Sequence, residues 1–295
     1  MIYEKRIVER GRFKGRIVHD HAFEGVREFR TYAEERAAAI ADETKGYETS
    51  WMGGTIARAM ELLAQGGDVK LAEQAKALAL NVPLPDVSTY KQEPTLMVAG
   101  GTPCIGAWAS GEPQCMVNIE DIESDRSPLR IFVDTVSSAG VDADSMMKAG
   151  LMVSALADLL AQIRPVEVWA CVGLSASNDA GWGSNNRGAQ VFRTQLTTPF
   201  SLAEMAMMIG FYPITRGISY GLGKKLEPSV LHWPFGDYQA HAVDGGSPHA
   251  FGTFMNEQDV YVPGTTLHEK TMDVEKWLRE KLAEIMRGPG KLEAI

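Results

Sequence analysis

The chain has 295 residues, of which 45% are hydrophobic and 23% are charged, a composition typical of a globular protein that can bury a core. No run of eighteen apolar residues occurs, and the start MIYEKRIVERGR lacks the apolar segment of a signal peptide, so we expect neither a membrane span nor secretion and place the protein in a cytoplasm. The formal net charge of -9 disfavours a nonspecific grip on nucleic acid over the whole surface.

The first part of the chain is predicted to be mostly helical. In VREFRTYAEERAAAIAD (26–42) apolar side chains recur at helical spacing. A second helix is predicted for TIARAMELLAQ, with Thr49 and Ser50 as candidate caps, and a third for VKLAEQAKALAL, capped by Asp68. Together with the basic start, these helices define residues 1–85 as a basic arm and a helical N-terminal part.

Residues 86–295 are predicted to form an α/β core with a C-terminal amphipathic helix. Up to residue 128, glycine and proline interrupt the chain, and the pattern supports only short strands. LRIFVDT (129–135), SMMKAGLMVSALADLLAQI (145–163) and PVEVWACVGL (165–174) then form a strand, a helix capped by Asp142 or Asp144, and a parallel strand. AQVFRTQL is predicted to pair antiparallel with the latter strand. The predicted fold class is α/β, with a mixed, partly parallel central sheet flanked by helices.

The end of the chain holds two further predicted helices. SLAEMAMMIGFY is apolar, whereas DVEKWLREKLAEIMRG (273–288) is charged and amphipathic. Residues 228–268 are rich in glycine, proline and histidine and are expected to contain short strands. The C-terminal helix and the basic arm are both candidates for a subunit contact, so the sequence does not decide whether the protein forms a homo-oligomer.

Positive charge is concentrated in two segments of this acidic chain. Residues 1–16 and residues 180–226 each carry a net charge of +4. The second segment begins with AGWGSNNRGAQVFRT, a glycine-rich ribbon tip that carries an indole ring and two guanidinium groups. Single-stranded nucleic acid is held by this combination, because cations follow the phosphates and exposed rings stack on the bases. The candidate binding residues are Trp182, Arg187, Arg193, Tyr220, Lys224, Lys225, Arg10, Arg12 and Lys14.

A structural role competes with binding at both segments. Trp182 is as well suited to covering the sheet as to stacking on a base. The basic N-terminal run is equally compatible with a solvated or subunit-pairing arm.

The loop after the strand at 129–135 suggests a second kind of site. It reads DTVSSAG, so that Asp134 follows a parallel strand and Ser138 lies four residues later. The order of strand, loop, helix, strand and antiparallel edge ribbon resembles the opening of a von Willebrand factor A-type domain. That family binds a divalent cation through Asp-x-Ser-x-Ser, whose middle position is here Val136. We therefore prefer a helix-capping role for Asp134 or Ser137 and keep Asp134 and Ser138 as weak metal candidates.

Few features of this sequence indicate catalysis or a cofactor. No nucleophile elbow, phosphate-binding loop or His-Glu-x-x-His motif occurs, and the three cysteines, an odd number without metal-type spacing, are expected to be buried or half-buried thiols. His232, His241 and His249 are spaced too widely for a compact metal motif. We expect no enzyme and no cofactor, with a hydrolase that uses Asp134 or the histidine loop as the remaining alternative.

The size, the acidity, the helical N-terminal part before an α/β core and the basic aromatic segments are similar to the Drc-type family of lytic podoviruses. Those proteins bind single-stranded DNA and assist a phage RNA polymerase. The resemblance implies a noncatalytic, single-stranded-DNA-binding cofactor of transcription in the host cytoplasm, with DNA and polymerase as partners. The alternative is a von Willebrand factor A-like protein-interaction module with a degenerate metal site, at whose contact face Asp134, Ser137 and Ser138 would lie.

Overall fold

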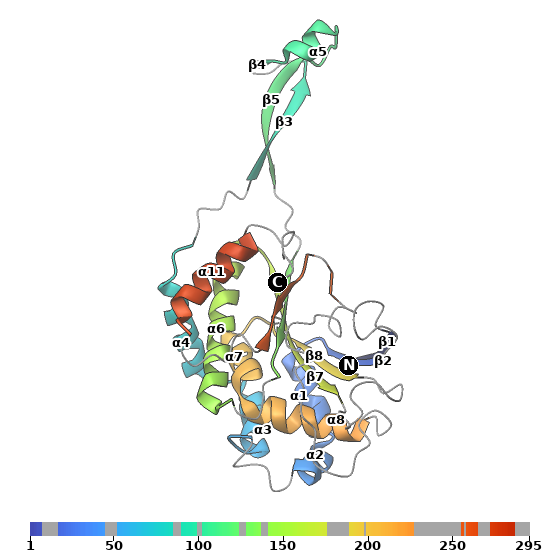
Figure 1. Cartoon of the computed structure of the whole chain (residues 1–295), viewed down its shortest axis with the longest axis vertical. Coiled ribbons are helices and arrows are strands. Elements are labelled where there is room, and N and C mark those ends of the chain that lie inside the picture. Colours follow the sequence, from blue (N-terminus) through green and yellow to red (C-terminus); the bar gives the residue numbers. More distant parts are fainter. Residues whose placement is uncertain are drawn as a thin grey trace.

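The computed structural model describes residues 1–7, 17–44, 52–84, 90–98, 102–123, 128–136, 141–175, 189–197, 199–226, 255–256, 258–264 and 272–286. Its centre is a mixed six-stranded sheet in the order β1-β2-β8-β7-β6-β9 (Figure 1). The strands are β1 (Ile2–Ile7), β2 (Ile17–Phe23), β6 (Leu129–Asp134), β7 (Val166–Ser175), β8 (Ala189–Gln195) and β9 (Val260–Val262). The predicted fold class is therefore confirmed.

The predicted βαβ unit is present. β6 leads into α6 (Ala143–Ala161) and pairs in parallel with β7, while β8 pairs antiparallel with β7. Asp142 caps α6, because its carboxylate accepts a hydrogen bond from the backbone N–H of Ser145 at 2.8 Å. One expectation was wrong: β8 is an interior strand, since β2 pairs in parallel with its other side.

The first 23 residues contain two strands where an arm was expected. β1 and β2 form an antiparallel pair that extends the sheet beyond β8. The helices that follow are α1 (Val26–Glu34), α2 (Ala37–Thr44), α3 (Ile56–Gln65) and α4 (Val69–Leu80), so the single helix expected over 26–42 is divided in two. Thr55, rather than Thr49 or Ser50, caps α3, and Asp68 caps α4 as predicted. These helices share one apolar core with α6, so the described part of residues 1–85 packs together with the rest of the fold.

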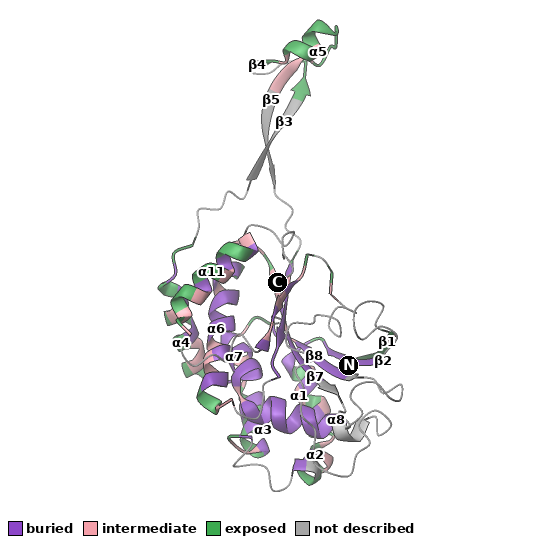
Figure 2. Cartoon of the chain, viewed as in Figure 1, coloured by how far each residue is buried: buried purple, intermediate pink, exposed green. Residues whose placement is uncertain are grey.

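Helices cover one face of the sheet and bury most of the core (Figure 2). Besides α6 they include α7 (Leu202–Gly210), the π-helix η2 (Pro213–Ser219), α8 (Tyr220–Leu226) and α11 (Val274–Met286). α7 and α11 were predicted from their patterns. Leu278, Leu282 and Ile285 of α11 are buried in this core, so the apolar face of that helix is used within the chain.

α6 and α7 cross at two glycines. A Cβ built on Gly150 would lie 2.2 Å from the backbone oxygen of Ala206, and one built on Gly210 would lie 2.9 Å from the backbone oxygen of Met146. Only glycine at these positions lets the two backbones approach so closely.

A β-hairpin stands away from the body of the molecule (Figure 1). Its strands are β3 (Tyr90–Met97), β4 (Thr102–Pro103) and β5 (Met116–Glu123), and the short helix α5 (Ile105–Ala109) lies at its tip. We call residues 90–98 and 102–123 the hairpin extension. The sequence pattern indicated short strands in this region but not their projection from the core.

Candidate nucleic-acid interface

The topology attaches residues 8–16, from the first predicted basic segment, and residues 176–188, which include the start of the second, at the same end of the sheet. Ile7 of β1 pairs with Ile17 of β2, and the neighbouring Val18 pairs with Ala189 of β8, which also pairs with Ser175 of β7. Residues 8–16 are joined to the sheet at Ile7 and Ile17, and residues 176–188 at Ser175 and Ala189. Strands lie about 4.8 Å apart, so these four attachment points span about 14 Å. We call this region the Ile17 end of the sheet.

Most of the candidate binding residues lie outside the described residues. Arg10, Arg12 and Lys14 belong to 8–16, and Trp182 and Arg187 belong to 176–188. The structure therefore provides the attachment points of these segments, and the residue types come from the sequence.

Arg193 forms an ion pair inside the protein. Its Nε lies 2.8 Å from one carboxylate oxygen of Asp20 and 3.1 Å from the other, and its guanidinium lies over the Trp169 ring at 5.0 Å. Arg6 of β1 approaches the same carboxylate at 3.3 Å. The side chain of Arg193 is only 13% exposed and that of Asp20 is 1% exposed. We therefore no longer assign Arg193 as a phosphate contact.

Tyr220 is also withdrawn, because it is buried in α8. That helix packs against α2, and a Cβ on the adjacent Gly221 would lie 3.1 Å from the Cα of Ile40. Lys224 and Lys225 are in α8 as well, but their side chains lie outside the described residues.

Asp134 is buried at the end of β6 and has local hydrogen-bond partners. One carboxyl oxygen accepts from the backbone N–H of Val136 at 2.9 Å, and the other lies 3.3 Å from the Tyr261 hydroxyl. Asp134 thus accepts a hydrogen bond from the loop that follows β6, whereas Asp142 caps α6. Because only 2% of Asp134 is exposed, it does not form a contact face. Ser137 and Ser138 lie outside the described residues.

Burial raises the pKa of Asp134 from 3.8 to about 7, against the opposing effects of its two hydrogen bonds. The folded protein therefore binds a proton that the unfolded chain releases near pH 4. As the pH rises from 4 through 7, this carboxyl contributes a growing destabilisation of the fold. Two other titratable groups lie close to this carboxyl: the Tyr261 hydroxyl at 3.3 Å and the buried thiol of Cys171, whose pKa the Asp134 charge raises further.

Sequence reasoning missed the polar residues of β2. In IVHDHAF the two histidines face the helices and the aspartate between them faces the other side of the sheet, as strand alternation requires. The Tyr3 hydroxyl lies 2.7 Å from Nδ1 of His19, and His21 stacks on Phe192 with ring centroids 4.9 Å apart. The His-x-His spacing of His19 and His21 is the sequence feature that could have indicated these polar residues. Among the described residues, no three His, Cys, Asp or Glu side chains gather as metal ligands.

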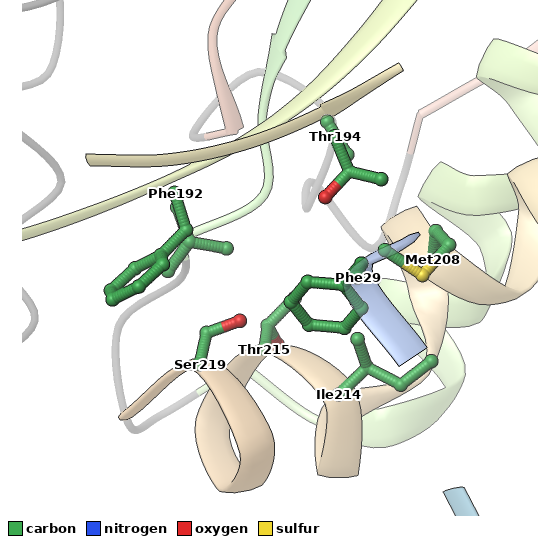
Figure 3. Close-up of a pocket in the computed structure, with 9 residues that line it drawn as sticks. Phe29, Phe192, Thr194, Met208, Ile214, Thr215 and Ser219 are labelled. Atoms are coloured by element: carbon green, nitrogen blue, oxygen red, sulfur yellow. The ribbon is translucent and has the colours of Figure 1, made fainter. Parts of the chain in front are cut away.

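A small cavity lies between the sheet and η2 (Figure 3). Figure 3 shows Phe29, Met208 and Ile214 among its lining together with Thr194 and Thr215. Its volume of about 10 Å³ leaves room for at most about one water molecule. This space is too small for a nucleotide or a cofactor.

Two further expectations concern the three widely spaced histidines and a membrane span. His232, His241 and His249 lie outside the described residues. Among the helices that the structure describes, none combines the length and the apolar character that a membrane crossing needs.

These features define a mixed α/β protein with a hairpin extension, in which the basic residues 8–16 and the residues 176–188, with Trp182 and Arg187, are attached at one sheet end. The chain belongs to the family described as Domain of unknown function (DUF7192), whose profile matches residues 14–198. The matched region runs from before β2 to just after β8 and includes the hairpin extension. No curated protein and no solved structure matches the chain.

Proposed function

We propose that this protein is a noncatalytic binding protein for single-stranded DNA and that the strand lies across the Ile17 end of the sheet. The observation that supports the proposal is the pairing of β2 with both β1 and β8. This pairing attaches residues 8–16 next to residues 176–188, although more than a hundred and fifty residues separate them in the sequence.

The chemistry of these segments suits a single strand. Residues 8–16 contribute Arg10, Arg12 and Lys14, and residues 176–188 contribute Trp182 and Arg187. The cations would neutralise phosphates, and the indole would stack on a base, which stabilises the complex by about 1–3 kcal/mol. A duplex offers no free base faces, so we expect it to bind more weakly.

The resemblance to the Drc-type family extends the proposal to the cellular role. The protein would act in the cytoplasm of a phage-infected cell as a cofactor of a phage RNA polymerase, and it would need no metal or small-molecule cofactor. The same role requires a surface for the polymerase.

The test is a titration of fluorescently labelled oligo(dT) at two or more salt concentrations. The variant Arg10→Ala/Arg12→Ala/Lys14→Ala should bind more weakly and reduce the slope of log K against log salt by about 2, or about 0.7 for each lost phosphate contact. Trp182→Phe should remove much of the quenching of Trp fluorescence that the oligonucleotide causes.

The control is Lys70→Ala/Lys76→Ala, which removes two exposed cations from α4, a helix that packs against α6 and α7. This control should bind like the wild type. The proposal fails if the wild-type protein does not bind oligo(dT), or if the triple variant and the control bind equally well.

A second candidate function is protein binding through the tip of the hairpin extension. Ile105 and Trp108 of α5 are 77% and 68% exposed, and Val98, which follows β3, is 72% exposed. An exposed aromatic ring on a projecting element is typical of a protein-binding anchor. The extension carries Lys91 against five carboxylates, so we expect a partner with an apolar pocket bordered by basic side chains.

The phage polymerase implied by the resemblance is the probe for this second function. Ile105→Ser/Trp108→Ser should weaken binding to the purified polymerase at least about tenfold while oligo(dT) binding is retained. Val69→Ser/Leu80→Ser is the control, because these two apolar side chains are 70% and 86% exposed but lie on α4. Equal polymerase binding by the two double variants would assign the contact to another surface.

A further inference from the structure

Two cysteines lie opposite each other at the base of the hairpin tip. β4 and β5 are antiparallel, with Thr102 opposite Val117 and Pro103 opposite Met116, and the next pair in this register is Cys104 with Cys115. The backbone N–H of Cys104 donates to the carbonyl of Cys115 at 2.7 Å, which shows that the pairing continues to this position. Directly opposite residues of antiparallel strands project on the same face, so the two thiols share one face of the hairpin.

The geometry of such a pair suits a disulfide. The Cα atoms of a hydrogen-bonded antiparallel pair are about 5.5 Å apart, within the range of about 4.4–6.8 Å that disulfides span. Cys104 has extended backbone angles (φ -81°, ψ 104°). Both thiols are free in the structure.

The tip between the two cysteines is held by its own backbone hydrogen bonds. The N–H of Trp108 donates to the carbonyl of Cys104, and the N–H of Glu112 donates to the carbonyl of Ala107. Gly111 has a φ of 74°, a conformation that glycine adopts without strain and that turns the chain back toward β5. These contacts keep Cys104 and Cys115 aligned across the hairpin in the reduced protein.

The third cysteine provides an internal contrast. Cys171 lies in β7 and is fully buried, and burial raises the pKa of its thiol. Cys104 and Cys115 are both partly exposed on an element that stands away from the core (Figure 2). An oxidant in solution can therefore reach two of the three thiols.

We infer that Cys104 and Cys115 form a reversible redox site, which a soluble disulfide such as oxidised glutathione converts into an intramolecular disulfide bond. The thiolate of one cysteine attacks oxidised glutathione, forms a mixed disulfide and releases one molecule of reduced glutathione. The second thiolate then attacks the protein sulfur of the mixed disulfide and releases the second molecule. Two protons leave the two thiols, the protein loses two electrons, and oxidised glutathione is reduced to two thiols.

The disulfide would close a covalent ring beneath the exposed apolar surface of the tip. Ile105 and Trp108 lie between the two cysteines in sequence, so the ring restricts the segment that presents them. Since oxidation adds no group and removes no side chain of the tip, it would change the order of this surface rather than its composition. The site is independent of the nucleic-acid interface at the Ile17 end of the sheet.

The test is mass spectrometry of the intact, reduced protein after incubation with oxidised glutathione at several protein concentrations. The expected product is the monomer that has lost two hydrogen atoms and carries no glutathione, and a non-reducing digest should link the peptides of Cys104 and Cys115. The rate should not depend on protein concentration, and reduced dithiothreitol should restore the starting mass. Cys171 should be recovered as a free thiol.

Two variants separate this site from ordinary thiol reactivity. Cys104→Ser and Cys115→Ser should each stop at the mixed disulfide and gain one glutathione, whereas Cys171→Ser should still form the intramolecular bond. Recovery of wild-type Cys104 and Cys115 as two glutathione adducts, as unmodified thiols or as a disulfide between two chains would overturn the inference.

Discussion

Replacement of Arg193 by glutamine tests whether this residue stabilises the fold, as the structure indicates, or contacts a ligand. The substitution keeps a hydrogen-bonding side chain and removes the positive charge that faces Asp20 at 2.8 Å. The Asp20 carboxylate is 1% exposed, so water cannot replace the lost partner. Removal of one partner of a buried ion pair costs about 3–5 kcal/mol. Arg6 remains 3.3 Å from the carboxylate, and we therefore expect about 3 kcal/mol.

Urea unfolding followed by circular dichroism measures this loss. The midpoint should fall while the slope m is unchanged, because the substitution alters the stability and not the surface exposed on unfolding. Arg58→Gln is the control, since Arg58 pairs with Glu61 on the surface of α3, where both side chains are about half exposed, and its midpoint should not move.

The same variant separates stability from binding. Arg193→Gln should bind oligo(dT) like the wild type at a temperature at which it is folded. A variant with wild-type stability and reduced oligonucleotide affinity would refute the assignment of Arg193 to the core ion pair and would restore it as a phosphate contact.

Three further predictions concern other parts of the fold. Gly150→Ala should lower the urea midpoint, because its Cβ meets the backbone of Ala206 at 2.2 Å, whereas Gly106→Ala, which has no neighbour within 4 Å, should not; a midpoint raised by Gly150→Ala would show that helix propensity outweighs the contact. Asp134→Asn should match the wild type at pH 4 and exceed its stability at pH 8, since the buried carboxyl has a pKa of about 7 and is charged only at the higher pH; equal urea midpoints at pH 8 would contradict this. Trp108→Ser should leave the thermal midpoint unchanged, because its side chain is exposed, and a marked drop would mean that the ring packs on the protein.

Local patterns in the sequence identified the elements whose structure depends on neighbours along the chain. The apolar runs of β6 and β7 and the long apolar helix α6 between them follow directly from the residues, as does the cap at Asp68. The cap of α3 was placed too early, because several hydroxyl residues precede that helix and only the observed start selects Thr55.

The strand β2 could not be recognised in the same way. Its sequence IVHDHAF has polar residues on both faces, and all of them are buried. The alternation rule assumes that polar side chains face water. Here Asp20 is compensated by Arg193, which follows 173 residues later, so the chemistry that permits this strand is invisible from its own segment.

The sequence by itself determined the α/β class, most of the helices and the uneven distribution of charge. Only the tertiary structure decided that β2 joins β8, that residues 8–16 and residues 176–188 attach side by side, that Arg193 pairs with Asp20 and that Cys104 lies opposite Cys115. The physical reason is that helices and caps depend on residues within a few positions of one another, whereas strand pairing and buried ion pairs depend on partners that only the folded chain brings together.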